Sequence, residues 1–446
     1  MAELIKEYHL NFPGKSMVGL YVMQDPLLLI RDPDLVKTIV QTDFTSFRHH
    51  HATNYEIDPL LDQNPFFSND DKWKNARKVV LSMMTLKKLK DVSLIIVDNA
   101  QKFIKHLDEK IKGEDYIELE GKDTFRRVTV AIAANAVLSL EEGMFGQNSS
   151  HLFKEMMKDV FASSTTKAIK FSVFFFLPAL NSIFKSGFVP NKVNKKFASI
   201  VNNLLEERQN GDTRRDLFQH LIEYCKDKDM SKASIISNTF MFFMESYETS
   251  ALTLSFLAYD MAAHPEIQEK LREHINEVIE KNGNEISYES INEMTYLEKV
   301  LQESMRFHPV AGHLRKFCSQ ATELMGSDGL HVKLKPGDQV MCSMDGIHRD
   351  PSLWKNPEEF RPERFDKDSE EFQQRHNYAY IPFGEGPRTC PGKRFGTLIV
   401  RLIIVTLLRE YSIEKSPKLK EPVTLDPKNF LSSIEGGAWL RLRKLS

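Results

Sequence analysis

The sequence predicts a mainly α-helical protein with a small β lobe, and three observations support this. From about residue 72 to residue 301, apolar residues recur mostly at helical spacing. Near the start of the chain, Met17–Met23 and Pro26–Asp32 look like extended segments. A third stretch, "LHVKLKPGDQVMC", alternates in polarity and turns at Pro336–Gly337. We therefore expect strands from both ends of the chain to form the β lobe beside a helical body.

Individual elements have their own local signals. "PEIQEKLREHINEVIE" predicts a helix that starts at Pro265, because proline suits the first helical position. Thr295 and Glu298 have the spacing of a capping box at the start of another helix. Thr397–Leu408 is apolar enough to predict a buried helix. The segment from residue 351 to residue 380 is rich in proline and charge, so we expect it to be irregular but ordered.

The bulk composition excludes several classes of protein. The 446 residues are 41% hydrophobic and 27% charged, with a net charge of -2, which argues against nucleic acid as the main partner. No run of 18 apolar residues predicts a transmembrane helix, and the first residues lack the apolar core of a signal peptide. The cysteines have no zinc-site spacing, and neither do they suggest a disulfide framework. They are Cys225, Cys318, Cys342 and Cys390.

One of these cysteines lies in a loop of unusual composition, "PFGEGPRTCPGKRFG", directly before the apolar helix. A thiolate beside a helix N-terminus is stabilised by free N–H groups and by the helix dipole. Glycines allow tight bends and a close approach to a flat ligand, and Arg388 is placed to pair with a ligand carboxylate. A metal that takes one thiolate and has its equatorial ligands in a macrocycle is haem iron. An ordinary buried cysteine explains the thiol but not its neighbours.

The loop resembles the haem-binding signature of the cytochrome P450 family, F-x-x-G-x-R-x-C-x-G, at all five positions. The resemblance runs from "RDPDLVKTIV" to "GGAWLRLRKLS", and "HPEIQEKLRE" is similar to insect microsomal, detoxification-type members. It implies the cytochrome P450 fold, a helical bundle with a small β lobe, as one haem domain over residues 1–446. It also implies that Cys390 ligates the iron of haem b, that Phe383 packs beside it, that Gly392 lets the backbone approach and that Arg388 meets a propionate.

Further motifs fit the same family. Glu303 and Arg306 form an E-x-x-R pair at helical spacing, and "PERF" adds Arg364; the resemblance implies a structural network behind the haem. Trp73 and Arg77 resemble the helix that contacts a propionate.

A further propionate contact follows the E-x-x-R helix. Arg315 enters the predicted site, although the sequence leaves open whether Arg315 or Lys316 makes this contact.

The long helix ending before Pro265 carries a predicted acid–alcohol pair, Glu248 and Thr249, which in the family guides protons to bound dioxygen. Where relatives have Ala-Gly, this chain has Glu245 and Ser246. Glu245 matches a position at which fatty-acid ω-hydroxylase relatives carry a glutamate that esterifies a haem methyl group. Two alternatives stay open: a Glu245–haem ester, or a hydrogen-bonded carboxylate that changes proton delivery or substrate polarity. Candidate cavity walls are Phe66, Phe67, Phe243, Val310 and Phe430.

The resemblance implies a haem-thiolate monooxygenase acting on an apolar xenobiotic, fatty acid, steroid or terpenoid. Its electrons would come from NADPH through NADPH-cytochrome P450 reductase, with cytochrome b5 as a second candidate donor. The alternatives are a haem-binding protein without turnover, or a lyase or isomerase, against which the acid–alcohol pair argues. A basic surface suits an acidic redox partner, but an ordinary solvated face is the other interpretation. It comprises Lys72, Lys74, Lys78, Lys87, Lys88, Lys393 and Arg394.

The expected location is the cytoplasmic face of the endoplasmic reticulum membrane. The N-terminal anchor and proline-rich hinge of microsomal members are not found in this sequence. Either the sequence is shortened at its start, or the protein attaches to the membrane surface only peripherally. The apolar segment Phe171–Pro190 either dips into that surface and roofs the substrate site or forms an ordinary core helix and loop.

Overall fold

The computed structural model describes residues 2–22, 24–50, 58–61, 63–140, 188–209 and 216–445, with a few positions between 153 and 173. The longer helices are α1 (Ala2–Leu10), α3 (Asp70–Met83), α4 (Leu86–Ile111), α5 (Gly121–Leu138), α9 (Asn191–Gln209), α10 (Leu217–Asp227), α11 (Lys232–Ala263), α12 (Pro265–Lys281), α14 (Thr295–Phe307) and α17 (Lys393–Glu410). The shorter ones are α2 (Pro33–Lys37), α13 (Tyr288–Glu293), α15 (Met344–Arg349), α16 (Glu370–Gln374), the π-helix η1 (Thr38–Thr42) and the 3₁₀ turns η2 (Pro59–Leu61), η3 (Pro362–Phe365), η4 (Asn377–Ala379) and η5 (Gly386–Arg388).

The strands confirm a β lobe assembled from both ends of the chain. They are β1 (Met17–Val22), β2 (Asp25–Ile30), β3 (Ile117–Glu120), β4 (His313–Phe317), β5 (Thr322–Met325), β6 (His331–Leu334), β7 (Gln339–Ser343), β8 (Tyr411–Lys415) and β9 (Trp439–Lys444). One sheet has the order β1-β2-β7-β4, so two N-terminal strands pair with two that lie about 300 residues later. β6 and β7 flank the predicted turn but join different sheets: β6 pairs with β5, whereas β7 pairs with β2 and β4.

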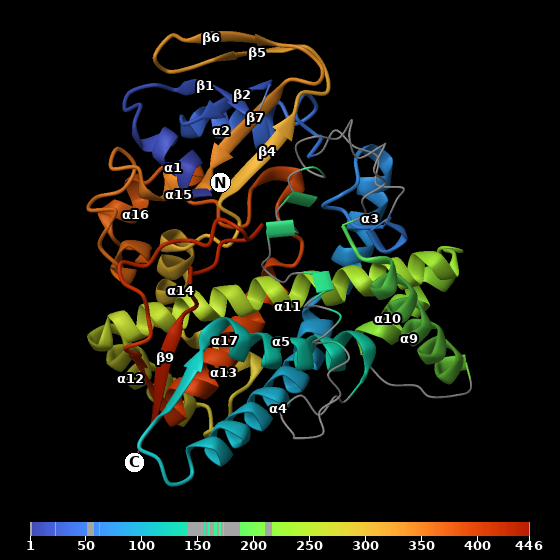
Figure 1. Cartoon of the computed structure of the whole chain (residues 1–446), viewed down its shortest axis with the longest axis vertical. Coiled ribbons are helices and arrows are strands. Elements are labelled where there is room, and N and C mark those ends of the chain that lie inside the picture. The colour runs from blue at the N-terminus through green and yellow to red at the C-terminus, as the bar shows by residue number, and fades with distance from the viewer. Residues whose placement is uncertain are drawn as a thin grey trace.

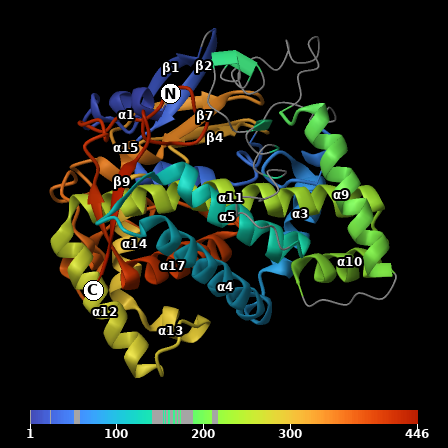
Figure 2. The same ribbon diagram turned by 60° about the horizontal axis from the view of Figure 1, so that its bottom comes forward.

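Helix α11 runs through the middle of the helical body. In both views it crosses the molecule between the sheet β1-β2-β7-β4, with α1 and α15, and the helices α4, α5 and α17 (Figures 1 and 2). Most of its side chains are buried, as its apolar sequence predicts. α17, the predicted apolar helix, is buried along the same core. Across the described residues, no helix is long and apolar enough to span a membrane.

Helix starts follow the predictions in one case and depart from them in another. Pro265 occupies the first turn of α12, as expected. The predicted capping box at the start of α14 is wrong: Thr295 is the first helical residue, and the position before it, Met294, makes no side-chain cap. A reciprocal cap forms instead at α13, between Ser287 and Ser290. The signal for α14 fails because Thr295 lies one residue inside the helix.

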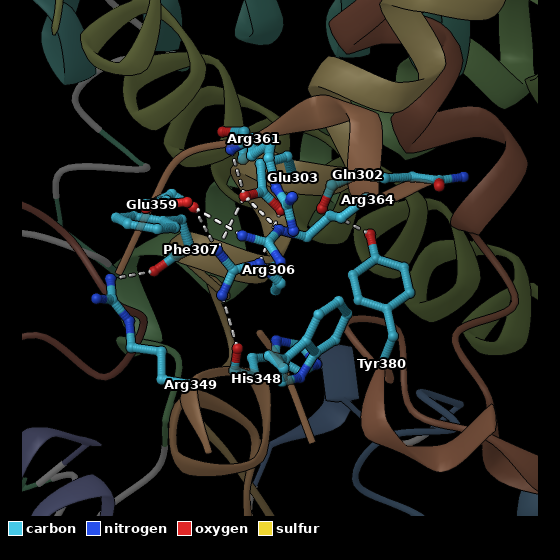
Figure 3. Close-up of polar contacts among 12 residues, drawn as sticks. Gln302, Glu303, Arg306, Phe307, His348, Arg349, Glu359, Arg361, Arg364 and Tyr380 are labelled. Atoms are coloured by element: carbon cyan, nitrogen blue, oxygen red, sulfur yellow. Dashed lines mark hydrogen bonds and ion pairs between the residues drawn. The ribbon is translucent and has the colours of Figure 1, made fainter. Parts of the chain in front are cut away.

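The predicted network behind the site is present and fully buried (Figure 3). Arg306 donates to Glu303 through Nε at 2.7 Å and Nη2 at 2.9 Å, one helical turn apart on α14. Arg364 in η3 donates to the same carboxylate at 3.0 Å, and the backbone N–H of Arg361 does so at 2.8 Å. Arg306 also donates to the carbonyl oxygen of His348 at 2.8 Å. Glu303 and Arg306 together therefore tie α14, α15 and the segment before η3 to one another.

Glu303→Leu tests this network. It leaves two buried guanidinium groups without their shared carboxylate, and losing one partner of a buried ion pair typically costs about 3–5 kcal/mol. We expect a decrease of that size in the free energy of unfolding, measured by urea denaturation. Glu298→Leu is the matched control on the same helix, because that side chain is part-exposed and its loss should have a much smaller effect. Equal stability of the two variants would contradict a structural role for Glu303.

Candidate functional site

Cys390 lies just before α17, which has Gly392 at its N-cap. The backbone N–H of Cys390 donates to the carbonyl oxygen of Phe383 at 2.9 Å, which fixes the loop. The backbone N–H groups of Gly392 and Lys393 donate to the Cys390 sulfur. Two donors and the positive end of the helix dipole are thus directed at the thiol, and both stabilise negative charge on sulfur.

The thiol faces a space inside the protein. Cys390 has exposed surface, yet burial is the largest cause that raises the pKa of its thiol to about 11. Surface that is accessible and nevertheless surrounded by protein belongs to an internal cavity. Glu245 on α11 has the same combination: its side chain is exposed, and burial raises its pKa. Because Glu245 also raises the pKa of Cys390, the two groups lie near the same space, here called the thiol cavity.

Two glycines of the cysteine loop, Gly386 and Gly392, meet different local requirements. Gly386 has φ of 72°, in the left-handed region, and a Cβ there would lie 1.9 Å from the carbonyl oxygen of Val40 in η1. Gly386 therefore lets the loop pass over η1. A Cβ at Gly392 would lie 3.9 Å from the Cys390 sulfur, an ordinary contact distance on the side of the thiol.

Arg388 is held by backbone oxygens. Its Nη1 donates to the carbonyl oxygens of Pro65 and Ser68 at 3.0 and 2.9 Å, and its guanidinium lies 4.4 Å from the Trp73 ring centroid. Burial lowers the pKa of Arg388 to about 9. Arg77, one turn after Trp73 on α3, donates to the carbonyl oxygen of Thr389 at 2.7 Å. Two guanidinium groups thus flank the cysteine loop, and their hydrogen bonds in the described structure go to uncharged groups.

The strand β4 distinguishes Arg315 from Lys316, because neighbouring residues on a strand point to opposite faces. Arg315 donates to Gln339 at 3.0 Å. Lys316 is 1% exposed, and its ammonium has no hydrogen-bond partner in the described parts of the chain. Burial lowers the pKa of Lys316 well below its usual value, and Arg388 lowers it further. The geometry therefore places Lys316, rather than the predicted Arg315, beside Arg388.

The predicted acid–alcohol pair points in two directions. Glu248 is 3% exposed and accepts two hydrogen bonds from Arg126 on α5: one from Nε at 2.7 Å, the other from Nη2. Thr249 instead shares a helix face with Glu245 and donates from its hydroxyl to the Glu245 carbonyl oxygen at 2.7 Å. Glu245 accepts from Asn64 Nδ2 at 3.0 Å. Glu245 is thus hydrogen-bonded in this structure, and its ester with haem stays a prediction.

Sequence reasoning missed Arg126 and Asn64. The only available signal was that a buried carboxylate needs a partner, which does not identify one. Arg126 lies 122 residues before Glu248, and Asn64 lies 181 residues before Glu245. Neither separation follows a local spacing rule.

The five residues predicted to line the cavity also lie in different surroundings. Phe243 is fully buried and packs against Phe197, so it belongs to the core and its assignment as a wall was wrong. Val310 packs against the small cluster around Phe256. The rings of Phe66 and Phe67 lie 5.0 Å apart in the segment that follows Asn64. Phe430 is part-exposed. Apart from its last three residues and an isolated position, the segment 171–190 falls outside the described residues.

The side chains that could ligate a metal limit which metal-containing group can bind at Cys390. Within the described ranges, no three His, Cys, Asp or Glu side chains cluster as a metal site would require. A metal bound through Cys390 alone must bring its other ligands with it, as a macrocycle does. The unpaired ammonium of Lys316, beside Arg388, fits a group that carries carboxylates. The residues present therefore fit haem.

Comparison with known proteins gives one consistent family. The family model described as "Cytochrome P450" matches residues 1–440. The chain is 29% identical to Probable cytochrome P450 6a14 of Drosophila melanogaster, covering 100% of this chain and 92% of that protein. It is 30% identical to Cytochrome P450 6B2 of Helicoverpa armigera (99% and 88% covered). It is 31% identical to Cytochrome P450 6B1 of Papilio polyxenes (98% and 88% covered).

The ion pair between Arg126 on α5 and Glu248 on α11 leads to a prediction about the free energy of unfolding. Arg126→Met leaves the Glu248 carboxylate buried without its charged partner, which should cost about 2–3 kcal/mol of unfolding free energy in urea denaturation. Adding Glu248→Gln should recover part of the loss, because no charge is then left buried. Arg127→Met is the matched control, since Arg127 pairs with Asp123 in a part-exposed pair and should matter much less. A double variant no more stable than Arg126→Met would contradict the coupling.

Proposed function

Because the chain belongs to the cytochrome P450 family and is a haem-thiolate monooxygenase, we propose that Cys390 is the ligand to the haem iron. The observation that carries the proposal is the position of its thiol. It faces an internal cavity and receives two backbone hydrogen bonds at the start of α17. Binding a metal favours the thiolate, because coordination stabilises the deprotonated sulfur. Phe383 anchors the same loop and Gly392 leaves the side of the sulfur open.

The buried cations would hold the propionates of haem b. Arg388, with Trp73 beneath it, and Lys316 lie together on one side of the loop. Arg77 adds a third positive charge next to Thr389. Carboxylates would give these cations charge-assisted hydrogen bonds in a buried setting, which are stronger than those to carbonyl oxygens. Lys316 therefore replaces Arg315 as the proposed contact.

Haem supplies the activation of dioxygen, and one oxygen atom enters an apolar substrate. The chain's own residues would control the cavity around that chemistry. Thr249 presents a hydroxyl on the cavity face of α11, as its shared face with Glu245 indicates. Glu248 would take part in proton handling only after exchanging its contact with Arg126, which holds the carboxylate against α5.

The family requires a redox partner, and we propose NADPH-cytochrome P450 reductase, with cytochrome b5 as a second donor. Exposed cations on α3 and at the start of α17 support an acidic partner on that face. They are Lys72, Lys74, Lys78, Lys393 and Arg394. Arg77 links α3 to the cysteine loop, so a partner on this face would be close to the thiol. Lys88 is less available to a partner, because its ammonium group donates a hydrogen bond to the carbonyl oxygen of Ser82.

We propose one haem domain over residues 1–446, at the cytoplasmic face of the endoplasmic reticulum membrane, by resemblance to microsomal members. The substrate class is apolar; fatty acids, steroids, terpenoids and xenobiotics all remain candidates. Membership of an enzyme family favours turnover over the alternative of a haem-binding protein without catalysis.

The first test is the absorption spectrum of the reduced, carbon-monoxide-bound protein. The wild type should show the red-shifted Soret band of thiolate-ligated haem, and Cys390→Ala should lose it. Cys342→Ala is the control, because Cys342 is buried in β7. A red shift that persists without Cys390 would overturn the assignment. Consumption of NADPH with added reductase, coupled to an oxygenated product, then checks turnover.

A second test separates Lys316 from Arg315 by haem retention. Lys316→Met keeps the length of the side chain but removes its charge, so haem should transfer to excess apomyoglobin about tenfold faster, the effect of losing one charge-assisted hydrogen bond. Arg315→Met should leave the rate close to that of the wild type, since Arg315 is held by Gln339. The reverse order of the two variants would return the propionate contact to Arg315.

A further inference from the structure

Asn64 and Glu245 form a polar pair at the edge of the thiol cavity that the catalytic assignments above do not use. Asn64 lies between η2 and α3 and is 1% exposed. Its Nδ2 donates to Glu245 Oε1 at 3.0 Å, while its Oδ1 accepts from the backbone N–H of Phe66 at 2.8 Å. Because the Phe66 N–H can only donate, it fixes the orientation of the amide. Asn64 must therefore present a donor to Glu245, which positions the carboxyl group.

The second carboxyl oxygen of Glu245 is left over for a ligand. Asn64 takes Oε1, and no hydrogen bond from the described parts of the chain reaches Oε2. The side chain is exposed although its neighbours on α11, Met244 and Ser246, are buried. An accessible carboxyl oxygen in a cavity can accept a hydrogen bond from water or from a ligand that displaces the water.

Within the described residues, no cation takes this role. The guanidinium of Arg126, which reaches α11 from α5, is bound by Glu248. Burial raises the pKa of Glu245, and the opposing effect is the Asn64 hydrogen bond, not a positive charge. The group that meets Oε2 must therefore be compatible with a carboxyl group whose charged form is disfavoured.

A hydroxyl meets this requirement better than an ammonium group. It donates to a carboxylate and both donates to and accepts from a carboxylic acid, whereas an ammonium ion needs the ionised form. Two aromatic side chains, Phe66 and Phe67, follow Asn64 along the chain, with ring centroids 5.0 Å apart. Apolar walls with a few fixed polar groups are typical of sites that orient a ligand.

We propose that Asn64 and Glu245 form a subsite that binds the hydroxyl group of an otherwise apolar substrate. The proposal rests on the proposed function, because it takes the thiol cavity as the substrate site. The substrate class is then narrower than apolar molecules in general: it consists of hydrocarbons that already carry an alcohol. A reaction that places a hydroxyl on a hydrocarbon skeleton must supply such a substrate.

The test compares two ligands of equal size, 1-decanol and 1-methoxynonane, of which only the alcohol can donate a hydrogen bond. Binding to the haem-loaded protein is measured by isothermal titration calorimetry, so that the result does not depend on turnover. The wild type should bind the alcohol about tenfold more tightly than the ether, as expected for one well-placed buried hydrogen bond. Glu245→Leu should reduce this ratio to about one.

Three further variants sharpen the test. Glu245→Gln should keep a several-fold preference, because an amide still accepts from a hydroxyl. Asn64→Leu should lower the ratio by releasing the carboxyl group from its orientation. Ser250→Ala is the matched control on α11, since Ser250 faces Gly396 of α17, and it should leave the ratio unchanged.

The outcomes separate this inference from the proposed function. Equal binding of alcohol and ether by the wild type, or a preference that survives in Glu245→Leu, would overturn the subsite. If Glu245→Leu does not fold, an unchanged ratio in Asn64→Leu overturns it equally well. The carbon-monoxide spectrum of the same samples reports on Cys390 alone. A normal spectrum with no alcohol preference rejects only the subsite, whereas a missing red shift rejects the haem ligand.

Discussion

The hydrogen bonds between the start of α17 and the Cys390 sulfur are the interaction on which the site depends. They require three features at once: a loop that turns tightly, a helix that begins immediately after it, and a core that holds that helix in place. Gly386 supplies the turn by passing close to the carbonyl oxygen of Val40, and the buried face of α17 supplies the anchor. The Glu303 network then ties α14 and α15 to the segment before η3, which precedes the loop in sequence. The start of α17 therefore contributes both to the stability of the fold and to the chemistry proposed for Cys390.

Around this helix end the described residues concentrate buried positive charge that makes no hydrogen bond to a carboxylate. Burial lowers the pKa of both Arg388 and Lys316, which indicates that each charge is held at a cost. Such an arrangement is unfavourable for an empty core and favourable for binding a dianionic group. The contrast with Glu303 is informative, since there the protein provides its own carboxylate for two buried guanidinium groups. The buried ion pairs of Glu303 support the fold. The buried cations Arg388 and Lys316, which make no hydrogen bond to a carboxylate among the described residues, would instead favour an anionic ligand.

Local and motif-based features were the part of the structure that the sequence could predict. The Cys390 loop, the Glu303–Arg306 pair one turn apart and the helix beginning at Pro265 all depend on near neighbours, and they are present. The features that could not be predicted depend on pairing between distant segments. Which face of β4 is buried follows from its pairing with β7, and this buries Lys316 and places Arg315 on Gln339. The partners of the two glutamates on α11 lie more than a hundred residues away.

The two glutamates also show what residue spacing alone leaves open. Glu245 and Glu248 are three residues apart, so they lie close together on α11. The structure assigns them to different neighbours: α5 binds Glu248 through Arg126, and the segment before α3 binds Glu245 through Asn64. Glu248 is held by a charged partner, whereas Glu245 has only an amide and an open space. Of the two, only Glu245 is exposed, and it lies close enough to Cys390 to raise the pKa of that thiol, so Glu245 is the one placed to meet a ligand in the thiol cavity.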